Sequence, residues 1–295
     1  MLKIGTRGSK LALWQAHHAQ RELKEQGIES SLVIIKTKGD IVQHLSFDKI
    51  EGKGFFTKEI EDALLAKEID LAVHSMKDLP TEMHDSLLIA GVSSRANPSD
   101  MLIMSKSSTE SGRPLKIKSG ASIGTSSIRR KVQLSQIDPT LNLVDIRGNV
   151  PTRIGKVRDG QVDGVLLAAA GVERLELPMD DFITLKFNPL EFVPAPAQGV
   201  VAYQTRKDDR ITRQLVQKIH HKDVAGCTNI ERKILRLLEG GCQLPMGAYC
   251  THDNNGYHCV AALGSNPGKQ VTKVNYSQST SAGMAEHIVS LLKQL

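Results

Sequence analysis

The chain has 295 residues, of which 40% are hydrophobic and 24% are charged, and this composition indicates a folded globular protein with two or three domains. Its longest apolar stretch, GVLLAAAGV from Gly164, is too short to cross a bilayer. The N-terminal sequence MLKIGTRGSK lacks the apolar region and cleavage site of a secretory signal. We therefore expect a cytoplasmic protein that does not associate with a membrane.

The net charge is +6 and the isoelectric point is about 9.1. Such an excess suits nucleic acid, an anionic membrane surface or a small polyanionic substrate. Only 4% of the residues are aromatic, so the chain offers no platform on which bases could stack. The basic residues cluster near glycine-rich turns instead, which favours a ligand with carboxylate or phosphate groups.

The first ninety residues alternate between predicted strands and helices, which indicates an α/β domain with a largely parallel sheet. The predicted strands cover 2–6, 31–36 and 69–75, and the predicted helices cover 9–26 and 56–67. The stretch 37–54 has no hydrophobic periodicity and contains three glycines, so it is predicted to form a mobile loop.

A second α/β run begins near residue 100. Its predicted strands are MLIM, ASIGT, NLVDI and GVLLAA, with helices that start at Ser126, near Val150 and near Ala170. The proline-rich segment FVPAPAQG at 192–199 breaks this pattern and is predicted to cross between domains. The strand VVAYQT that follows could then return to the first domain.

The C-terminal part has a different pattern. A helix at 225–239 precedes three predicted strands, MGAYCTH, YHCVAAL and QVTKVNY, and a helix at 284–294 closes the chain. This order is typical of an α+β unit. We predict three domains, made of residues 1–95 with 196–213, residues 100–190, and residues 217–295. No internal repeat is evident.

The segment HSMKDLP places Ser75, Lys77 and Asp78 at the carboxyl end of a predicted strand. Ligands of open α/β sheets bind at that end. The neighbouring lysine favours the ionised form of the Asp78 carboxyl. The alternative interpretation is a surface turn with a local ion pair.

Several arginines lie near predicted turns or helix starts. In GTSSIRR, Arg129 and Arg130 occupy the first turn of a predicted helix, where cations oppose the helix dipole unless an anion is present. This local conflict indicates an anionic ligand, although a solvated basic face is an alternative. The full set comprises Arg7, Arg129, Arg130, Arg147, Arg153 and Arg174.

Cys242 lies in EGGCQLP, directly after two glycines that allow another molecule to approach the backbone closely. A thiol on such a loop is more accessible for reaction than one within a strand. The other cysteines are Cys227, Cys250 and Cys259, and they are expected to be buried. Neither the cysteines nor the histidines show metal-ligand spacing, so we expect no metal site.

Nine motifs occur in order between Thr6 and Ala248: TRGSKLALWQA, KTKGD, GKGFFTKEIE, HSMKDLP, GTSSIRR, RGNVPTR, AAAGVERL, PAPAQG and EGGCQLPMGA. Together they resemble the successive signatures of the hydroxymethylbilane synthase (porphobilinogen deaminase) family. The resemblance implies an α/β fold with two doubly wound lobes similar to type II periplasmic binding proteins, and a small α+β C-terminal domain.

The resemblance also implies a transferase of porphyrin and heme biosynthesis. Such an enzyme joins four porphobilinogen molecules into the linear tetrapyrrole hydroxymethylbilane and releases ammonia. It carries a dipyrromethane cofactor through a thioether bond, here to Cys242. It works as a monomer and passes its product to uroporphyrinogen-III synthase.

The resemblance assigns roles to individual residues, with Asp78 as the catalytic carboxylate. The cofactor would be held by Cys242, Lys77, Ser127, Arg129, Arg130 and Arg147. The substrate would be held by Arg7, Ser9, Ser75, Phe56, Arg153, Arg174 and Gln198, under a loop that carries Lys49 and Lys53. Ala197 stands where the family usually has glycine, and an alanine is expected to stiffen the segment.

Two other classes of function are weighed against this enzyme. A ligand-binding module would bind a polycarboxylate reversibly and leave Cys242 unmodified. A nucleic-acid-binding regulator would bind DNA with a strong dependence on salt concentration.

Overall fold

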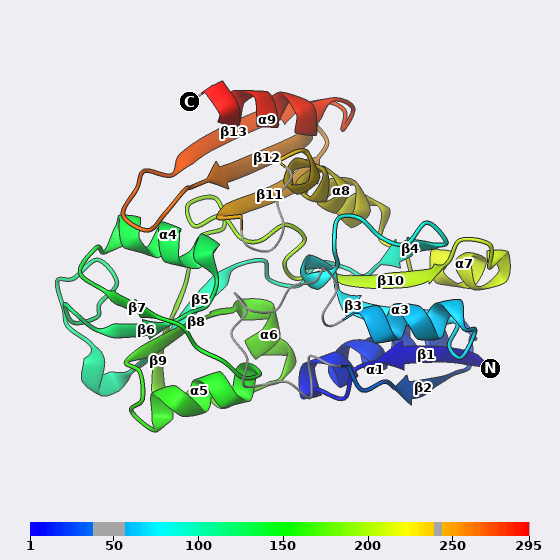
Figure 1. Cartoon of the computed structure of the whole chain (residues 1–295), viewed down its shortest axis with the longest axis horizontal. Helices are drawn as coiled ribbons and strands as arrows, with labels where there is room; N and C mark the ends of the chain where they lie inside the picture. Colours follow the sequence, from blue (N-terminus) through cyan, green and yellow to red (C-terminus); the bar gives the residue numbers. More distant parts are fainter. Residues whose placement is uncertain (38–56, 239–243, 295) are drawn as a thin grey trace. The chain divides into compact units, whose positions relative to one another are not determined.

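A computed structural model describes residues 1–37, 57–238 and 244–294. Its contacts divide the chain into two compact units, Met1–Ala96 with Gly199–Gly226, and Asn97–Gln198 with Cys227–Leu295. Both units contain a mixed sheet covered by helices, and the second also contains a smaller sheet (Figure 1). Among the described residues, no helix combines the length and the apolar character needed to span a membrane.

The sheet of the first unit has the strand order β2-β1-β3-β10-β4. Strand β10 runs antiparallel to both of its neighbours, while β2, β1 and β3 pair in parallel. The elements are β1 (Leu2–Thr6), α1 (Lys10–Glu25), β2 (Ser30–Ile34), α3 (Lys58–Leu65), β3 (Leu71–Ser75), the 3-10 turn η2 (Met76–Asp78), β4 (Leu87–Val92), β10 (Val201–Arg206) and α7 (Arg210–Gln217).

Helices α1 and α3 form two separate cores with this sheet. Helix α1 begins where the Ser9 hydroxyl accepts a hydrogen bond from the Ala12 amide at 3.3 Å. Its residues Ala16, Ala19 and Leu23 recur at helical spacing and are fully buried in the core formed with β1, β3 and β10. Helix α3 buries Ile60, Ala63 and Leu64 in a second core, which also contains Ala72 of β3.

The larger sheet of the second unit has the order β7-β6-β8-β5-β9, in which β5 runs antiparallel to β8 and β9. It thus repeats the topology of the first unit, with three parallel strands, one reversed strand and one further edge strand. The elements are β5 (Asp100–Ser105), the 3-10 turn η3 (Lys106–Ser108), β6 (Ser122–Gly124), α4 (Ile128–Ile137), β7 (Asn142–Val144), α5 (Val150–Arg158), β8 (Gly164–Ala168), α6 (Ala169–Arg174) and β9 (Phe182–Lys186).

The smaller sheet is an antiparallel meander, as the alternating sequence pattern predicted. Its strands are β11 (Met246–Asp253), β12 (Gly256–Leu263) and β13 (Thr272–Gln278). Helices α8 (Lys222–Leu237) and α9 (Met284–Gln294) contribute to one core with this sheet, in which Ile234, Ala261 and Ile288 are fully buried. Cys227, Cys250 and Cys259 belong to the same core, as expected.

The predicted α/β class and the C-terminal α+β part are confirmed. Strand β10 also returns to the first sheet, where it lies between β3 and β4. Strands β4 and β9 and helix α7 were not predicted. The boundaries of three domains stay a prediction, because compactness joins residues 97–198 with residues 227–295 in one unit.

Ala197 adopts a left-handed backbone conformation, with φ of 61°. This conformation costs an alanine about 1–2 kcal/mol relative to a right-handed one. The Ala197 amide donates a 2.6 Å hydrogen bond to the carboxylate of Glu231 on α8, which also accepts from the Cys250 amide at 2.8 Å. A buried carboxylate therefore holds the strained turn and links it to β11.

Asp100, the first residue of β5, forms the most connected buried polar cluster of the second unit. Its fully buried carboxylate accepts from the Arg129 Nη1 at 2.7 Å and from the Arg130 Nη2 at 2.6 Å. Gln198 donates to the same group at 3.0 Å. Arg129 also donates to the Val193 carbonyl and Arg130 to the Leu166 carbonyl. The carboxylate thereby connects β5 with the start of α4 and the crossover segment.

The charges in this cluster decide the state of the acid. Burial alone would raise the pKa of Asp100, but the adjacent guanidinium groups of Arg129 and Arg130 outweigh it and hold the pKa well below its ordinary value. Because the folded-state pKa is depressed, the carboxylate stabilises the fold above its ordinary pKa of 3.8. That stabilisation is lost progressively as the pH falls below this value.

Replacement of Asp100 by asparagine should lower the free energy of unfolding by about 3–5 kcal/mol, because two buried guanidinium groups would lose their carboxylate. Urea denaturation at neutral pH measures the change. Asp180→Asn, at an exposed position of the same unit, is the control and should change stability by less than about 0.5 kcal/mol. The Asp100→Asn variant should also lack part of the acid sensitivity of the wild type. Equal stability of the two proteins at neutral pH would contradict this role.

Candidate functional site

The carboxyl ends of two adjacent parallel strands place one set of candidate residues in the first unit. Strand β1 ends at Thr6, directly before Arg7, and β3 ends at Ser75, directly before the turn η2 that contains Lys77 and Asp78. The two strands are paired in parallel, so their carboxyl ends lie at the same edge of the sheet. The structure therefore brings Arg7, Lys77 and Asp78 to one edge, where the sequence placed them.

Asp78 ends the 3-10 turn η2 and is exposed, whereas Met76 in the same turn is buried. Met76 fixes the turn, because its amide donates to the Val200 carbonyl at 2.9 Å and its side chain is 1% exposed. The turn closes with a 3.3 Å hydrogen bond from the Leu79 amide to the Met76 carbonyl. Asp78 is thus an accessible carboxylate on a short turn that is anchored in the core.

Two serines of the candidate set have structural partners at this edge. Ser9 caps α1. Ser75 accepts a 2.7 Å hydrogen bond from the buried Gln15 of α1. The second contact attaches α1 to the end of β3, and the assignment of both serines to the substrate stays a prediction.

The corresponding edge of the second unit holds another set. Strands β6 and β7 pair in parallel, and their carboxyl ends lead to Ser127 and Arg147. The Ser126 hydroxyl joins the two ends, because it donates to the Ile146 carbonyl and accepts from the Ile146 amide. Ser127 is the residue before α4, and its side chain and that of Arg147 are partly exposed.

Helix α5 starts in the same region. Asn149 caps it through a 3.0 Å hydrogen bond from the Thr152 amide, and Arg153 donates from Nε to the Gly148 carbonyl at 2.7 Å. Gly148 has a φ of 109°, a conformation that suits glycine. Arg174 is the last residue of α6 and is partly exposed.

Arg129 and Arg130 have the anion that their position at a helix start requires, and it is Asp100 of the chain itself. The dipole conflict seen in the sequence therefore does not by itself require an external ligand at these two residues. The cluster nevertheless contains two guanidinium groups and one carboxylate, so its ion pairs leave an excess of one positive charge. Gln198 is fully buried beside them and donates to the carbonyls of Pro98 and Ser99.

The remaining candidates are Lys49, Lys53, Phe56 and Cys242, and all four lie outside the described residues. In the described ranges, no group of three or more His, Cys, Asp or Glu side chains could hold a metal ion.

Three residues near the candidates were missed in the sequence: Asp100, Gln15 and His74. Asp100 opens a predicted strand, but its partners are 29 and 30 residues away, and nothing local indicates them. Gln15 and His74 lie within quoted motifs, yet both occupy positions that also fit an ordinary core pattern. Only the packing of neighbouring elements shows that their side chains are buried and paired.

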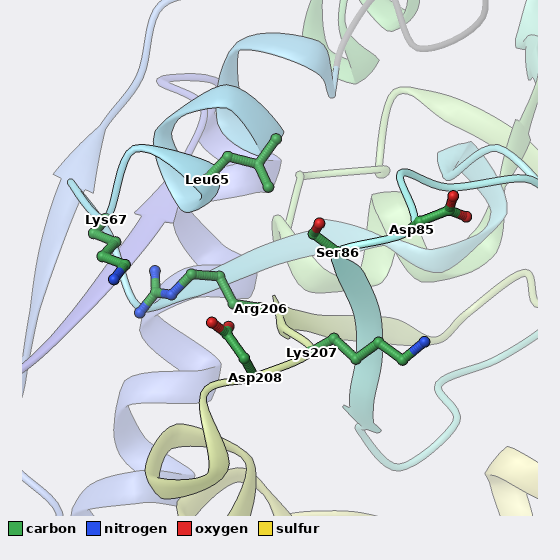
Figure 2. Close-up of a pocket in the computed structure, with 7 residues that line it drawn as sticks. All are labelled: Leu65, Lys67, Asp85, Ser86, Arg206, Lys207 and Asp208. Carbon is green, nitrogen blue, oxygen red and sulfur yellow. The ribbon is translucent and has the colours of Figure 1, made fainter.

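A surface pocket of about 460 Å³ lies at the other edge of the first sheet, lined by Leu65, Lys67, Asp85, Ser86, Arg206, Lys207 and Asp208 (Figure 2). Strand β10 runs antiparallel to β3, so Arg206 at its end lies away from the Asp78 turn. Figure 2 shows that Lys207 and Asp85 extend away from the Arg206 side chain. Arg206 itself pairs with Asp70 and Asp209. The charges do not converge, so this pocket is not the candidate site.

Two family models match nearly the whole chain. The model described as "Porphobilinogen deaminase, dipyromethane cofactor binding domain" matches residues 2–214, and "Porphobilinogen deaminase, C-terminal domain" matches residues 225–293. A curated porphobilinogen deaminase of Chloroherpeton thalassium is 41% identical over 291 residues, which covers 97% of this chain and 91% of the relative. The porphobilinogen deaminase of Helicobacter hepaticus is 40% identical over 280 residues and covers 94% and 85%.

Solved structures give weaker likenesses. A periplasmic substrate-binding protein of an ABC transporter from Coxiella burnetii has a TM-score of 0.45 at 14% identity, over 76% of this chain and 94% of that one. The periplasmic VFT2 domain of BvgS from Bordetella pertussis has a TM-score of 0.44 at 12% identity, over 74% and 86%.

The two family models together cover residues 2–214 and 225–293, and both curated relatives are about 40% identical over nearly the whole chain. The chain belongs to the porphobilinogen deaminase family.

Proposed function

We propose that this chain is a hydroxymethylbilane synthase, a transferase that joins four porphobilinogen molecules into hydroxymethylbilane and releases ammonia at each addition. The observation that carries this conclusion is that the two family models together match nearly the whole chain. The reaction serves tetrapyrrole synthesis, from which porphyrins and heme derive. The charged side chains at the carboxyl ends of the parallel strands in the two larger sheets suit this reaction.

Asp78 supplies the negative charge that the reaction needs. When ammonia leaves the aminomethyl group of porphobilinogen, positive charge develops on the pyrrole ring and its nitrogen. A carboxylate that is already oriented stabilises this charge better than water, which must reorient first. The anchored η2 turn holds Asp78 in an accessible position for this task. The same carboxylate can carry a proton to the departing amine and accept one from the ring carbon.

The basic residues fit a substrate that carries two carboxylates on each ring. Arg7 and Lys77 lie at the same edge as Asp78, and Arg147, Arg153 and Arg174 are partly exposed in the second unit. Guanidinium groups bind carboxylates through paired hydrogen bonds, and they keep their charge at any physiological pH. These side chains are proposed to bind the acetate and propionate arms, with help from Ser9, Ser75 and Gln198. The overall charge of +6 attracts such an anionic substrate.

The chain contains the dipyrromethane-binding domain of the family. The cofactor consists of two substrate units and is therefore also acidic. The excess positive charge of the Arg129, Arg130 and Asp100 cluster is of the sign needed to hold such a group. Ser127, Arg147 and Lys77 are proposed to complete the set, with Cys242 as the covalent anchor. When bound, the dipyrromethane supplies the pyrrole carbon to which the first substrate is joined.

Further parts of the proposal concern the cellular setting. We expect a monomer in the cytoplasm that binds neither nucleic acid nor membranes and passes its product to uroporphyrinogen-III synthase. Lys49, Lys53 and Phe56 are proposed to act on the substrate from the segment before α3.

Replacement of Asp78 by asparagine should reduce kcat by on the order of 10²–10⁴-fold, because the amide carries no charge to oppose the one on the pyrrole ring. The KM for porphobilinogen should change little, since other residues bind the acid arms. Ammonia release and hydroxymethylbilane formation measure the effect. Asp85→Asn is the matched control, because Asp85 is exposed and lines the pocket at the other sheet edge. Turnover of the Asp78→Asn protein close to that of the wild type would remove this residue from its role.

Replacement of Cys242 by serine should abolish the covalent attachment of the cofactor, because serine has no sulfur atom with which to form the thioether bond. Intact-mass spectrometry of the purified wild type should show the chain plus one dipyrromethane, and the variant should show the chain alone. Cys227→Ala, at a buried thiol of the C-terminal core, should keep the added mass. A wild type that stays unmodified and inactive after incubation with porphobilinogen would contradict the proposed enzyme.

A further inference from the structure

The last two residues of β3 carry polar side chains that point to opposite faces of the sheet. Ser75 is bonded to Gln15 of α1 on one face. His74 is 6% exposed on the other face, and its Nε2 lies 3.0 Å from the Oε1 of Gln204 on β10. Gln204 is fully buried and donates from Nε2 to Glu61 Oε1 of α3 at 2.8 Å. A chain of hydrogen bonds thus runs from β3, the strand that precedes the Asp78 turn, through β10 to α3.

The partners in this chain determine where its protons lie. A carboxylate oxygen can only accept, so the amide nitrogen of Gln204 must face Glu61. The amide oxygen of Gln204 therefore faces His74, and the Nε2 of His74 must donate a proton to it. Burial first, and then the positive charge of Arg7, lower the pKa of His74 to about 4, although the hydrogen bond with Gln204 acts in the opposite direction. Near neutral pH the imidazole is accordingly uncharged and carries its proton on Nε2.

A neutral imidazole at this place has two consequences. It anchors the end of β3 without adding a positive charge near Arg7, whose charge remains for an acidic ligand. It also cannot serve as a proton donor for the reaction at neutral pH without breaking its bond to the buried Gln204. His74 therefore has the properties of a support for the neighbouring turn rather than those of an acid or base.

We propose that His74 and Gln204 are positioning residues for the Ser75–Asp78 turn, and that the donor at His74 Nε2 keeps the Asp78 carboxylate in its productive place. This inference rests on the role proposed above for Asp78. A fixed charge acts on a developing charge only while it stays oriented, so a loosened turn lowers turnover. Affinity changes less than turnover, because most of the residues proposed to bind the acid arms of the substrate lie outside this turn.

The test compares two substitutions of His74 in the full-length, cofactor-loaded protein. His74→Leu removes the donor, and kcat should fall on the order of 10- to 10²-fold with KM within about twofold of the wild type. His74→Gln keeps an amide donor near the position of Nε2, and most of kcat should return. An amide cannot exchange protons with the substrate, so rescue by glutamine separates positioning from acid–base catalysis.

Two further variants keep the inference testable if His74→Leu does not fold. Gln204→Leu breaks the chain in the middle, and Glu61→Leu breaks it at its partly exposed end; each should lower kcat with little change in KM. In a folded His74→Leu protein, the added Gln204→Leu substitution should cost less than it does alone, because both remove the same connection. Intact mass and circular dichroism report cofactor content and folding for each variant.

The outcomes separate this inference from the proposed function. If the wild type forms no hydroxymethylbilane, or Asp78→Asn turns over normally, the proposed function fails first. If those two proteins behave as expected but His74→Leu keeps the kcat of the wild type, the positioning role alone is wrong. A His74→Gln protein with a kcat as low as that of His74→Leu, and with one ionisation missing from the pH profile of its residual activity, would show that the imidazole itself transfers a proton, which also overturns the proposal.

Discussion

The buried carboxylate of Asp100 is the interaction on which the second unit depends. It accepts hydrogen bonds from Arg129, Arg130 and Gln198, which lie 29, 30 and 98 residues further along the chain. A single ion pair at such depth would gain little over an apolar contact, because both charges lose their hydration. The gain here is in geometry: one group fixes the start of β5, the first turn of α4 and the end of the crossover segment. The guanidinium groups are thereby held in place before any ligand arrives.

The same arrangement explains why a region rich in arginine can be stable. Two guanidinium groups in the first turn of α4 oppose the helix dipole, and the carboxylate of Asp100 compensates for that conflict. One positive charge remains in excess, and an acidic cofactor is the kind of molecule that would balance it. This residual charge is what the cofactor-binding role proposed above for the cluster rests on.

The two larger sheets solve the placement of chemistry in the same way. Each has three parallel strands followed by one reversed strand, β10 in the first unit and β5 in the second. The candidate side chains follow the carboxyl ends of the parallel strands in both: Arg7 and Asp78 in one unit, Ser127 and Arg147 in the other. The supports differ. Beside the Asp78 turn, the supports are hydrogen bonds of the uncharged side chains of His74 and Gln204, so they add no positive charge that could pair with the Asp78 carboxylate. In the second unit, ion pairs support the arginines instead.

The sequence by itself determined most elements, because hydrophobic periodicity, helix caps and turn residues are local signals. It identified the α1 and α9 helices, the C-terminal meander and the strand end that carries Asp78, and nine ordered motifs indicated the family. Strand β9, with four exposed or half-exposed positions, lacked a clear pattern, and the shared topology of the two sheets left no visible repeat. Only the tertiary structure decided that Asp100 forms ion pairs with Arg129 and Arg130 and that Gln204 orients His74. These contacts join residues that are 29 to 130 positions apart, and no local preference encodes them.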